Sequence, residues 1–222
     1  MDKEALDILC RCKLFDGTDK GDIPTMIKCL GAVVKSYSRG EAIFSEGDKA
    51  GLVGVILSGT VQIVKDDYYG NRNLLAMAEA GELFAEAYAC AGADTLPVSV
   101  IAISDCKILL INCKQIVTAD KTCKFHYLIM NNLLKIVSMK NILLNEKAEI
   151  TSKRTTKEKL MAYLSAYAKK CGMSEFDIPL NRQELADYLC VERSAMSAEI
   201  GKLKKEGKIH CSKNHFILLN EK

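Results

Sequence analysis

The sequence predicts an α+β protein in three consecutive parts: an antiparallel jelly-roll-like barrel, a long helix, and a small unit of helices and a β-hairpin. Three observations predict this fold class. Short apolar segments separated by turn signals fill the first half, a longer apolar pattern with helical spacing follows, and two short helical patterns precede a hairpin pattern near the end. We expect a barrel domain with an N-terminal helix at residues 1–115, the long helix at 116–150 and the last unit at 151–222.

The composition is that of an ordinary globular chain. Of its 222 residues, 49% are hydrophobic and 27% charged, which is enough apolar material for a core. No apolar run approaches the roughly 20 residues that a membrane helix needs, and charged residues interrupt the start where a secretory signal would be apolar. We therefore expect a cytoplasmic protein without membrane contact. Its ten cysteines stand singly in mostly apolar contexts, which favours reduced thiols.

Seven segments of the first half are predicted strands. Each is about four to eight residues long and rich in apolar or β-branched residues, and turn signals such as Ser58-Gly59 and Ala80-Gly81 separate them. The segments are Ala32–Tyr37, Glu41–Phe44, Leu52–Leu57, Thr60–Lys65, Asn73–Ala78, Val98–Ala102 and Lys107–Ile111. Many short strands at this spacing favour an antiparallel barrel of the jelly-roll type.

A long helix is predicted after about Lys114. Its apolar positions recur with alternating spacings of four and three, without Gly or Pro, over roughly 25 to 30 residues. The stripe comprises Phe125, Ile129, Asn132, Ile136, Met139 and Leu143. Such a near-heptad stripe suits a second copy of the helix, with Asn132 as a polar residue that sets the register. We expect a homodimer through this stripe; the alternative is that the helix packs on its own barrel.

The last part predicts a winged helix-turn-helix. Asn181 and Glu184 have the spacing of a capping box at the start of one helix, and a tight turn at Cys190–Glu192 leads into a second helix that ends before Gly207. Two apolar-rich halves about Ser212–Asn214 then predict a hairpin. Lys and Arg outnumber Asp and Glu by five over residues 151–222, whereas acidic residues outnumber basic ones by two before them. The basic unit fits a contact with double-stranded DNA.

Candidate DNA-binding residues follow from this geometry. The exposed start of the second helix carries Arg193 and Ser194, with Ser197 one turn further on the same face. Arginine is suited to bidentate contact with guanine in the major groove. Gln183, together with the backbone amides at the start of the first helix, and Lys202 are candidate phosphate contacts.

These residues carry a resemblance to a known family. Gly40–Asp48, Gly59–Val61 and Gly81–Glu86 are similar to the barrel of regulators of the cyclic-AMP-receptor and fumarate-nitrate-regulator (CRP/FNR) family, and Asn181–Leu189 and Val191–Ser197 are similar to its DNA-binding motif. The resemblance covers nearly the whole chain. It implies a cyclic-nucleotide-binding-like barrel and a homodimeric transcription regulator acting on a palindromic operator, with RNA polymerase as a further partner.

The effector site departs from the family pattern. Cyclic-nucleotide binders have Gly-Glu and Arg followed by a small hydroxyl residue, where this chain has Ala85-Glu86 and Leu96-Pro97. Without Arg, a buried phosphodiester lacks its bidentate partner. We therefore expect an unidentified small-molecule effector other than cyclic AMP. The expected site comprises Phe84, Ala85, Glu86, Leu96, Pro97 and Val98.

Other functions have less support. A redox- or metal-sensing regulator of the same fold is the alternative, through an iron–sulfur cluster or the pair Cys123 and His126, but Cys10 and Cys12 stand one residue apart and would point to nearly opposite sides of a helix. We assign no cofactor and no metal ligand. An enzyme is not expected, because the chain has no phosphate loop, zinc-protease motif or nucleophile elbow.

Overall fold

The computed structural model describes residues 2–69, 72–117 and 125–219, which fold into two compact units. Unit 1 extends to Met139 and unit 2 begins at Lys140, so the division falls inside the long helix α5 (His126–Thr151). The expected separate segment 116–150 is instead shared: α5 contributes side chains to the cores of both units. The helix has 26 residues, as its apolar period predicted.

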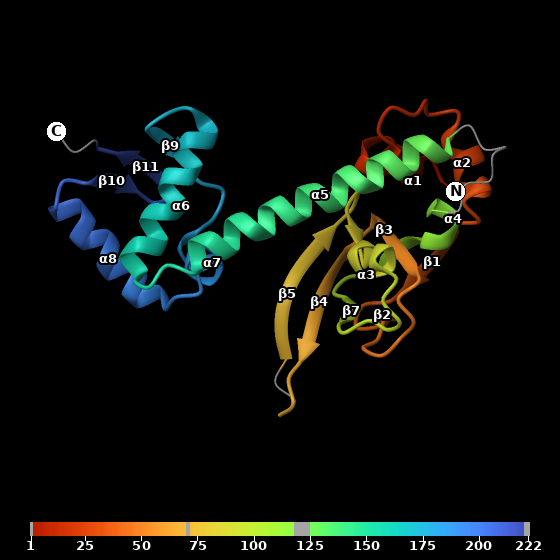
Figure 1. The fold of residues 1–222 in the computed structure, drawn as a ribbon, viewed down its shortest axis with the longest axis horizontal. Helices are drawn as coiled ribbons and strands as arrows, with labels where there is room; N and C mark the ends of the chain where they lie inside the picture. Colours follow the sequence, from red (N-terminus) through yellow and green to blue (C-terminus); the bar gives the residue numbers. More distant parts are fainter. Residues whose placement is uncertain (1, 70–71, 118–124, 220–222) are drawn as a thin grey trace. The chain divides into compact units, whose positions relative to one another are not determined.

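Unit 1 is the expected barrel (Figure 1). Before α5 it contains, in order, α1 (Lys3–Arg11), η1 (Lys13–Phe15), α2 (Ile23–Cys29), β1 (Val33–Tyr37), β2 (Ala42–Phe44), β3 (Leu52–Ser58), β4 (Thr60–Asp66), β5 (Arg72–Glu79), β6 (Leu83–Phe84), α3 (Glu86–Ala91), β7 (Ser99–Ala102), β8 (Cys106–Asn112) and α4 (Cys113–Val117). Its two four-stranded sheets have the orders β1-β8-β3-β6 and β2-β7-β4-β5, and every strand pair is antiparallel. The predicted jelly-roll-like class is confirmed.

Strand β3 explains how the layers of unit 1 are held together. Because successive side chains of a strand point to opposite faces, Val53, Val55 and Leu57 join one core and Ile56 joins the other. The first core lies between this sheet and the helices, with Leu9 of α1 and Ile129 of α5 among its members. The second lies between the two sheets. The sequence of β3 is apolar almost without interruption because this strand is buried on both faces.

The buried face of α5 differs from the prediction. Ile129, Asn132 and Ile136 are 1%, 3% and 8% exposed, because they pack against the rest of unit 1. The Asn132 side chain donates hydrogen bonds to the carbonyl oxygens of Leu14 (3.1 Å) and Asp16 (2.8 Å). The face of the helix that carries these three residues thus packs within one chain, and Asn132 fixes the N-terminal loop.

Other stripe residues lie differently. Phe125 is half-buried against the same core, whereas Met139 and Leu143 are about half exposed. Apolar side chains are also exposed at positions of α5 outside this stripe, namely Tyr127, Met130, Leu134, Ile142 and Leu144. Two apolar faces on one helix explain why the sequence pattern was ambiguous.

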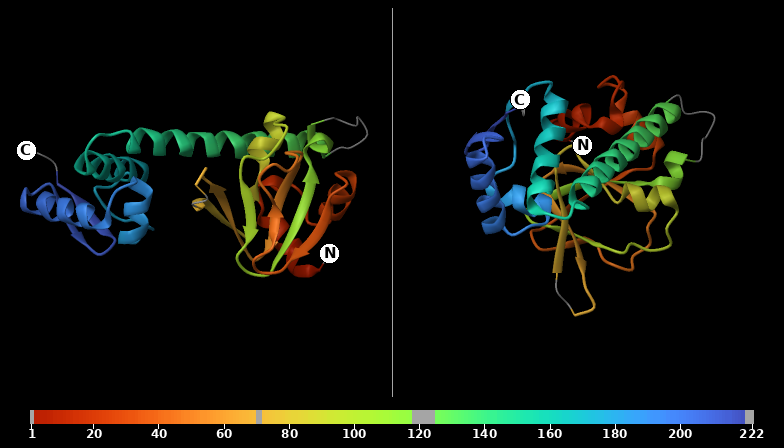
Figure 2. Two further views of the ribbon diagram at one scale, coloured as in Figure 1. Left: turned by 90° about the horizontal axis from the view of Figure 1, so that it is seen from below. Right: turned by 60° about the vertical axis from the view of Figure 1, so that its left-hand side comes forward.

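Unit 2 is the expected winged helix-turn-helix (Figure 2). After α5 it contains α6 (Thr156–Cys171), β9 (Glu175–Asp177), α7 (Arg182–Leu189), α8 (Arg193–Lys205), β10 (Ile209–Ser212) and β11 (His215–Leu218). The strands form one sheet in the order β10-β11-β9. The predicted capping box is present: the Asn181 side chain accepts from the amides of Gln183 (2.9 Å) and Glu184 (3.0 Å), and Glu184 accepts from the Asn181 amide.

The core of unit 2 is formed by the inner faces of the three helices and the sheet. Leu160, Leu185, Met196 and Phe216 are each fully buried in it. Within the described ranges, no helix is both long and apolar enough to cross a membrane.

Candidate DNA-binding face and effector site

Helix α8 is amphipathic in the way that a recognition helix requires. Met196, Ile200 and Leu203 fix its inner face in the core of unit 2. Arg193 and Ser197 lie one turn apart on the outer face and are exposed, as is Ser194. The structure thus brings the three predicted base-reading residues together on the outer face of the N-terminal half of α8.

Arg193 is free to bind an external acceptor. Its exposed side chain makes no hydrogen bond or ion pair with any residue that the structure describes. The turn between α7 and α8 is tight. Cys190 adopts a left-handed conformation (φ 52°), and the amide of Val191 donates to the Ala186 carbonyl at 3.0 Å. Lys159 of α6 stabilises this turn by donating to the carbonyl oxygens of Leu189 and Cys190 at 3.3 and 3.4 Å.

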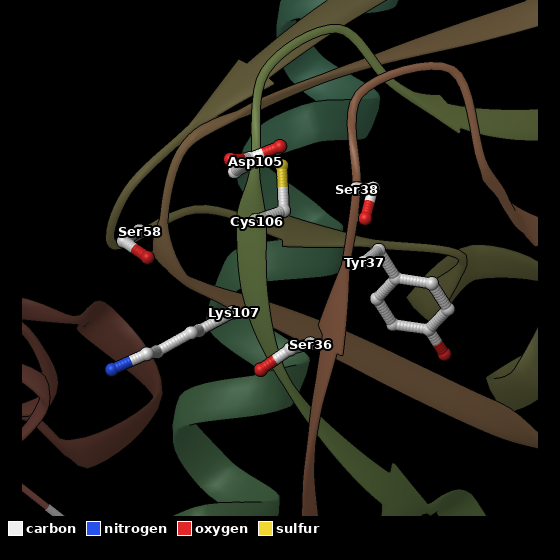
Figure 3. A pocket seen from close by; sticks show the side chains of 7 residues that line it. All are labelled: Ser36, Tyr37, Ser38, Ser58, Asp105, Cys106 and Lys107. Carbon is white, nitrogen blue, oxygen red and sulfur yellow. The ribbon is translucent and has the colours of Figure 1, made fainter.

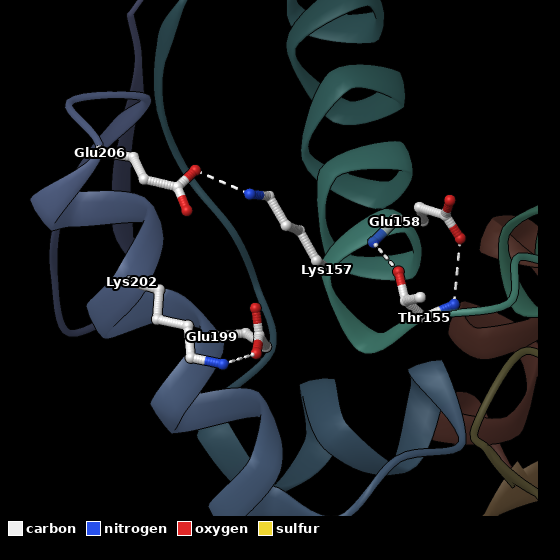
Figure 4. A network of polar contacts seen from close by, with 6 residues as sticks. All are labelled: Thr155, Lys157, Glu158, Glu199, Lys202 and Glu206. Atoms are coloured by element: carbon white, nitrogen blue, oxygen red, sulfur yellow. Dashed lines mark hydrogen bonds and ion pairs between the residues drawn. The ribbon is translucent and has the colours of Figure 1, made fainter.

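The two predicted phosphate contacts are already engaged. Gln183 donates from its side chain to Asp187 at 2.8 Å, and Asn181 occupies the Gln183 and Glu184 amides that were expected to hold a phosphate. In the structure those amides are therefore capped by the chain itself. Lys202 forms an ion pair with Glu199 at 2.6 Å (Figure 4), which raises the pKa of Lys202. Each side chain keeps further N–H donors that a phosphate oxygen can accept from.

Sequence reasoning missed Arg182, the first residue of α7. Its guanidinium carbon lies 5.0 Å from the centroid of the Phe216 ring in the wing, which is the hairpin of β10 and β11. Its Nη2 is 3.5 Å from Cys211 Sγ. Its buried Nη1 has no hydrogen-bond partner in the part of the chain that the structure describes. No spacing rule points to this contact, because Arg182 and Phe216 are brought together only by the fold. The contact places a cation between the helix-turn-helix and the wing.

The predicted effector pocket is filled by its own side chains. Phe84, Leu96 and Val98 are each 2% exposed. The Phe84 ring lies edge-on to Phe44 with centroids 5.6 Å apart, and a Cβ added at Gly54 would be only 2.1 Å from its Cζ. The ring therefore occupies the space against the inner face of β3. In the structure these three residues therefore belong to the core.

The remaining predicted site residues surround the start of α3. Ala85 precedes the helix in a left-handed conformation (φ 61°) that favours glycine, and Glu86 is its first residue and 3% exposed. Pro97 is half-buried. The neighbouring Leu96 is held by backbone hydrogen bonds to Gly47 and Asp48, both 2.8 Å. This loop is thus fixed to the turn after β2.

A different pocket lies at the ends of β1, β3 and β8 (Figure 3). Its volume is about 310 Å³, and its lining is polar: Ser36, Tyr37, Ser38, Ser58, Asp105, Cys106 and Lys107. Lys107 is bound to Asp2 at 2.7 Å, and burial together with Glu41 raises the pKa of Tyr37. No sequence pattern indicates this pocket, since its residues come from three separate strands and the turns beside them.

The two N-terminal cysteines considered for an iron–sulfur cluster differ in burial. Cys10 is exposed and Cys12 is buried. Cys123 is outside the described residues. His126 is 9% exposed, and its Nε2 has no hydrogen-bond partner within the described ranges. Among the residues that the structure describes, no three His, Cys, Asp or Glu side chains gather as metal ligands would.

Comparisons with known families match both units. Residues 34–119 match the cyclic nucleotide-binding domain and residues 158–222 match the Crp-like helix-turn-helix domain. The chain belongs to the CRP/FNR family of transcription regulators. Members of this family are DNA-binding regulators rather than enzymes, and the present member has their barrel, long helix and helix-turn-helix in the same order.

Relatives of this CRP/FNR member are distant. The transcriptional activator FnrL of Cereibacter sphaeroides is 23% identical over 83% of this chain and 75% of its own. A CRP-like cAMP-activated global regulator of Mycobacterium tuberculosis is 31% identical over 36% of this chain and 35% of its own. Among solved structures, the c-di-GMP-responsive regulator CLP of Xanthomonas campestris is similar in fold, with a TM-score of 0.57 and 19% identity over 91% of this chain and all of that one.

Proposed function

We propose that this protein is a homodimeric transcription regulator that binds a palindromic operator and responds to a small molecule other than a cyclic nucleotide. The observation that carries the proposal is the outer face of α8, where Arg193, Ser194 and Ser197 are exposed over a helix whose other face is fixed in the core. A helix presented in this way reads base edges in the major groove. Its dimer places two such helices about one helical turn of DNA apart.

The dimer uses the exposed side of α5. Tyr127 and Leu134 are seven residues apart and 75% and 64% exposed, and Met130 and Leu144 are fourteen apart and 40% and 65% exposed. This is the heptad spacing that two packed helices require. The opposite side is buried within unit 1, so a second copy of the chain is the partner that covers these residues.

The interior of the barrel does not suit a cyclic nucleotide as it stands. Phe84 fills the inner face of β3, and Leu96 occupies the position where the family's binders carry their phosphate-binding Arg. A ligand in the interior must displace the Phe84 ring, and a phosphodiester would lack a cationic partner there. An uncharged or weakly polar ligand fits the apolar interior better than a phosphodiester does.

We also propose RNA polymerase as a further partner, as the resemblance to the family implies. Transcription in vitro from a promoter that carries the selected operator tests this part. A change in transcript yield that follows operator occupancy supports it, and equal yields with and without the regulator contradict it.

DNA selection from a random pool tests the proposed function. We expect a palindrome with two half-sites, bound by the full chain. Arg193→Ala should weaken binding to this operator by about 1 to 3 kcal/mol and relax the preference at one base pair in each half-site, because a bidentate contact is lost.

Lys205→Ala is the matched control, since Lys205 is an exposed cation at the other end of the same helix. It should leave the base preference unchanged. If Arg193→Ala weakens binding equally on all sequences, Arg193 contacts phosphate and does not read a base. If no sequence is enriched, the proposed function is wrong.

A further inference from the structure

Helices α3 and α4 bring two thiols together in unit 1. The Sγ atoms of Cys90 and Cys113 lie 3.8 Å apart, although the residues are 23 positions apart in the sequence. The sulfurs of a disulfide are about 2.0 Å apart, so bond formation requires them to approach by roughly 2 Å. Rotation of the two cysteine side chains covers this distance without unfolding of α3 or α4.

The surrounding core holds the two backbones in place. Ala89, next to Cys90 on α3, and Ile116 of α4 belong to the same hydrophobic core as Cys113 and as Ile129 of α5. The two thiols therefore stay neighbours because their helices are packed, not because a flexible loop happens to place them together.

The two thiols differ in access to solvent. Cys113 is 3% exposed, whereas Cys90 is exposed on the surface of α3. A dissolved oxidant reaches Cys90 first and finds Cys113 behind it. An accessible thiol with a second thiol close by is the arrangement that converts a first oxidation into an internal disulfide.

We propose that Cys90 and Cys113 form a reversible intrachain disulfide that fixes α3 onto α4 and makes the sensing unit responsive to thiol redox state. The oxidant is a low-molecular-weight disulfide. The Cys90 thiolate attacks one of its sulfurs, which forms a mixed disulfide and releases one small thiolate. The Cys113 thiolate then attacks the Cys90 sulfur and displaces the second. Two protein thiols are oxidised, and the small disulfide is reduced to two thiols that take up both protons.

The reaction depends on pH. Partial desolvation of its sulfur raises the pKa of Cys90. The thiolate is the attacking species, so the rate should increase about tenfold per pH unit over the range from pH 7 to 9.

Mass spectrometry of the full chain after incubation with oxidised glutathione tests the proposal. We expect a Cys90–Cys113 linked peptide pair that dithiothreitol removes. The closed loop should raise the melting temperature of oxidised protein by roughly 5–10 °C. Cys10→Ser is the matched control, because Cys10 is an exposed helical thiol of the same unit, and this variant should behave as the wild type.

Two further variants assign the order of attack. Cys113→Ser should retain glutathione on Cys90, whereas Cys90→Ser should leave Cys113 unmodified and show no change in melting temperature on oxidation. Wild-type protein that accumulates glutathione on Cys90, or a disulfide between two chains, overturns the proposal. The inference goes beyond the proposed function, since the linked peptide is measured whether or not the chain binds DNA.

Discussion

At the scale of single residues, Ala85 shows where the segment before α3 departs from the family pattern and what this departure costs in stability. The left-handed backbone at this position (φ 61°) costs an alanine about 1 to 2 kcal/mol relative to glycine. Glycine in turn lowers the stability of the folded state by about 0.4 to 1 kcal/mol, because it gives the unfolded chain more conformational freedom. We therefore expect Ala85→Gly to stabilise the protein by about 0.5 to 1 kcal/mol, measured as the free energy of unfolding in urea.

Ala87→Gly is the control for this prediction. Ala87 lies within α3 and is exposed, so glycine there should destabilise by about 0.5 to 1 kcal/mol. Opposite signs for two alanine-to-glycine changes two residues apart would identify the backbone conformation as the cause. Destabilisation by both would show that Ala85 is not strained.

His215 in the wing gives the stability of unit 2 a pH dependence. Its ring nitrogens lie 3.1 Å from Asp177 and 3.1 Å from Glu175, and Asp177 first and then Glu175 raise the pKa of His215. A histidine pKa that is higher in the folded state stabilises the fold at pH values below its unfolded pKa of about 6.5. This stabilisation is lost as the pH rises through the folded-state pKa.

His215→Gln should therefore lower the urea midpoint more at about pH 5.5 than at about pH 9. The comparison of wild type and variant at both pH values measures this. His210→Gln, in the neighbouring strand, is the control and should show no such difference. An equal effect of His215→Gln at both pH values would mean that the carboxylates do not hold the charged ring.

At the scale of elements, the two apolar faces of α5 are predicted to have separate roles. Leu134→Glu places a charge on the exposed face and should convert the dimer to monomer with the fold retained, because Leu134 is 64% exposed. Ile136→Glu places the same charge in the core of unit 1, where Ile136 is 8% exposed, and should cost about 3 kcal/mol or more of stability. Light scattering and circular dichroism distinguish these results. A Leu134→Glu protein that remains dimeric would place the dimer contact elsewhere.

The elements themselves were predictable to different degrees. The seven predicted strands are present, because apolar segments bounded by turn signals are a local property of the chain. The two-residue strand β6 and the short helices α3 and α4 were missed, because segments of that length carry too few residues for a period to be seen. The Asn181 cap was predicted correctly because a capping box is also local.

Contacts between distant segments were not predictable in this way. Asn132 has the spacing of a seam residue, yet it binds carbonyl oxygens 116 and 118 positions away. Phe84 has the position of a pocket residue, yet Gly54 lets its ring fill the space. In both cases the side chain satisfies a requirement of the tertiary fold that the local pattern does not contain.

At the scale of the whole molecule, the sensing and DNA-binding roles rest on separate cores. The two cores of unit 1 lie on either side of one sheet, and the core of unit 2 draws only on residues from Ile150 onward. The helix α5 is the element that both units share. Any effector signal that reaches α8 must therefore change the equilibrium of this helix or of the units that it joins, and an effector does so only by binding one arrangement more tightly than another.

Cyclic AMP and cyclic GMP should fail to produce such a signal. Their anionic phosphodiester requires a cation, and the position of the family's Arg is occupied by the buried Leu96. The nucleotide would also have to displace the Phe84 ring from its contact with Phe44 and Gly54. We expect no heat of binding in calorimetric titrations and an unchanged affinity for the selected operator when either nucleotide is present. Operator binding in the same preparation is the control for active protein. A micromolar dissociation constant together with tighter operator binding would show that the Phe84 side chain can leave the interior and that another group supplies the missing charge.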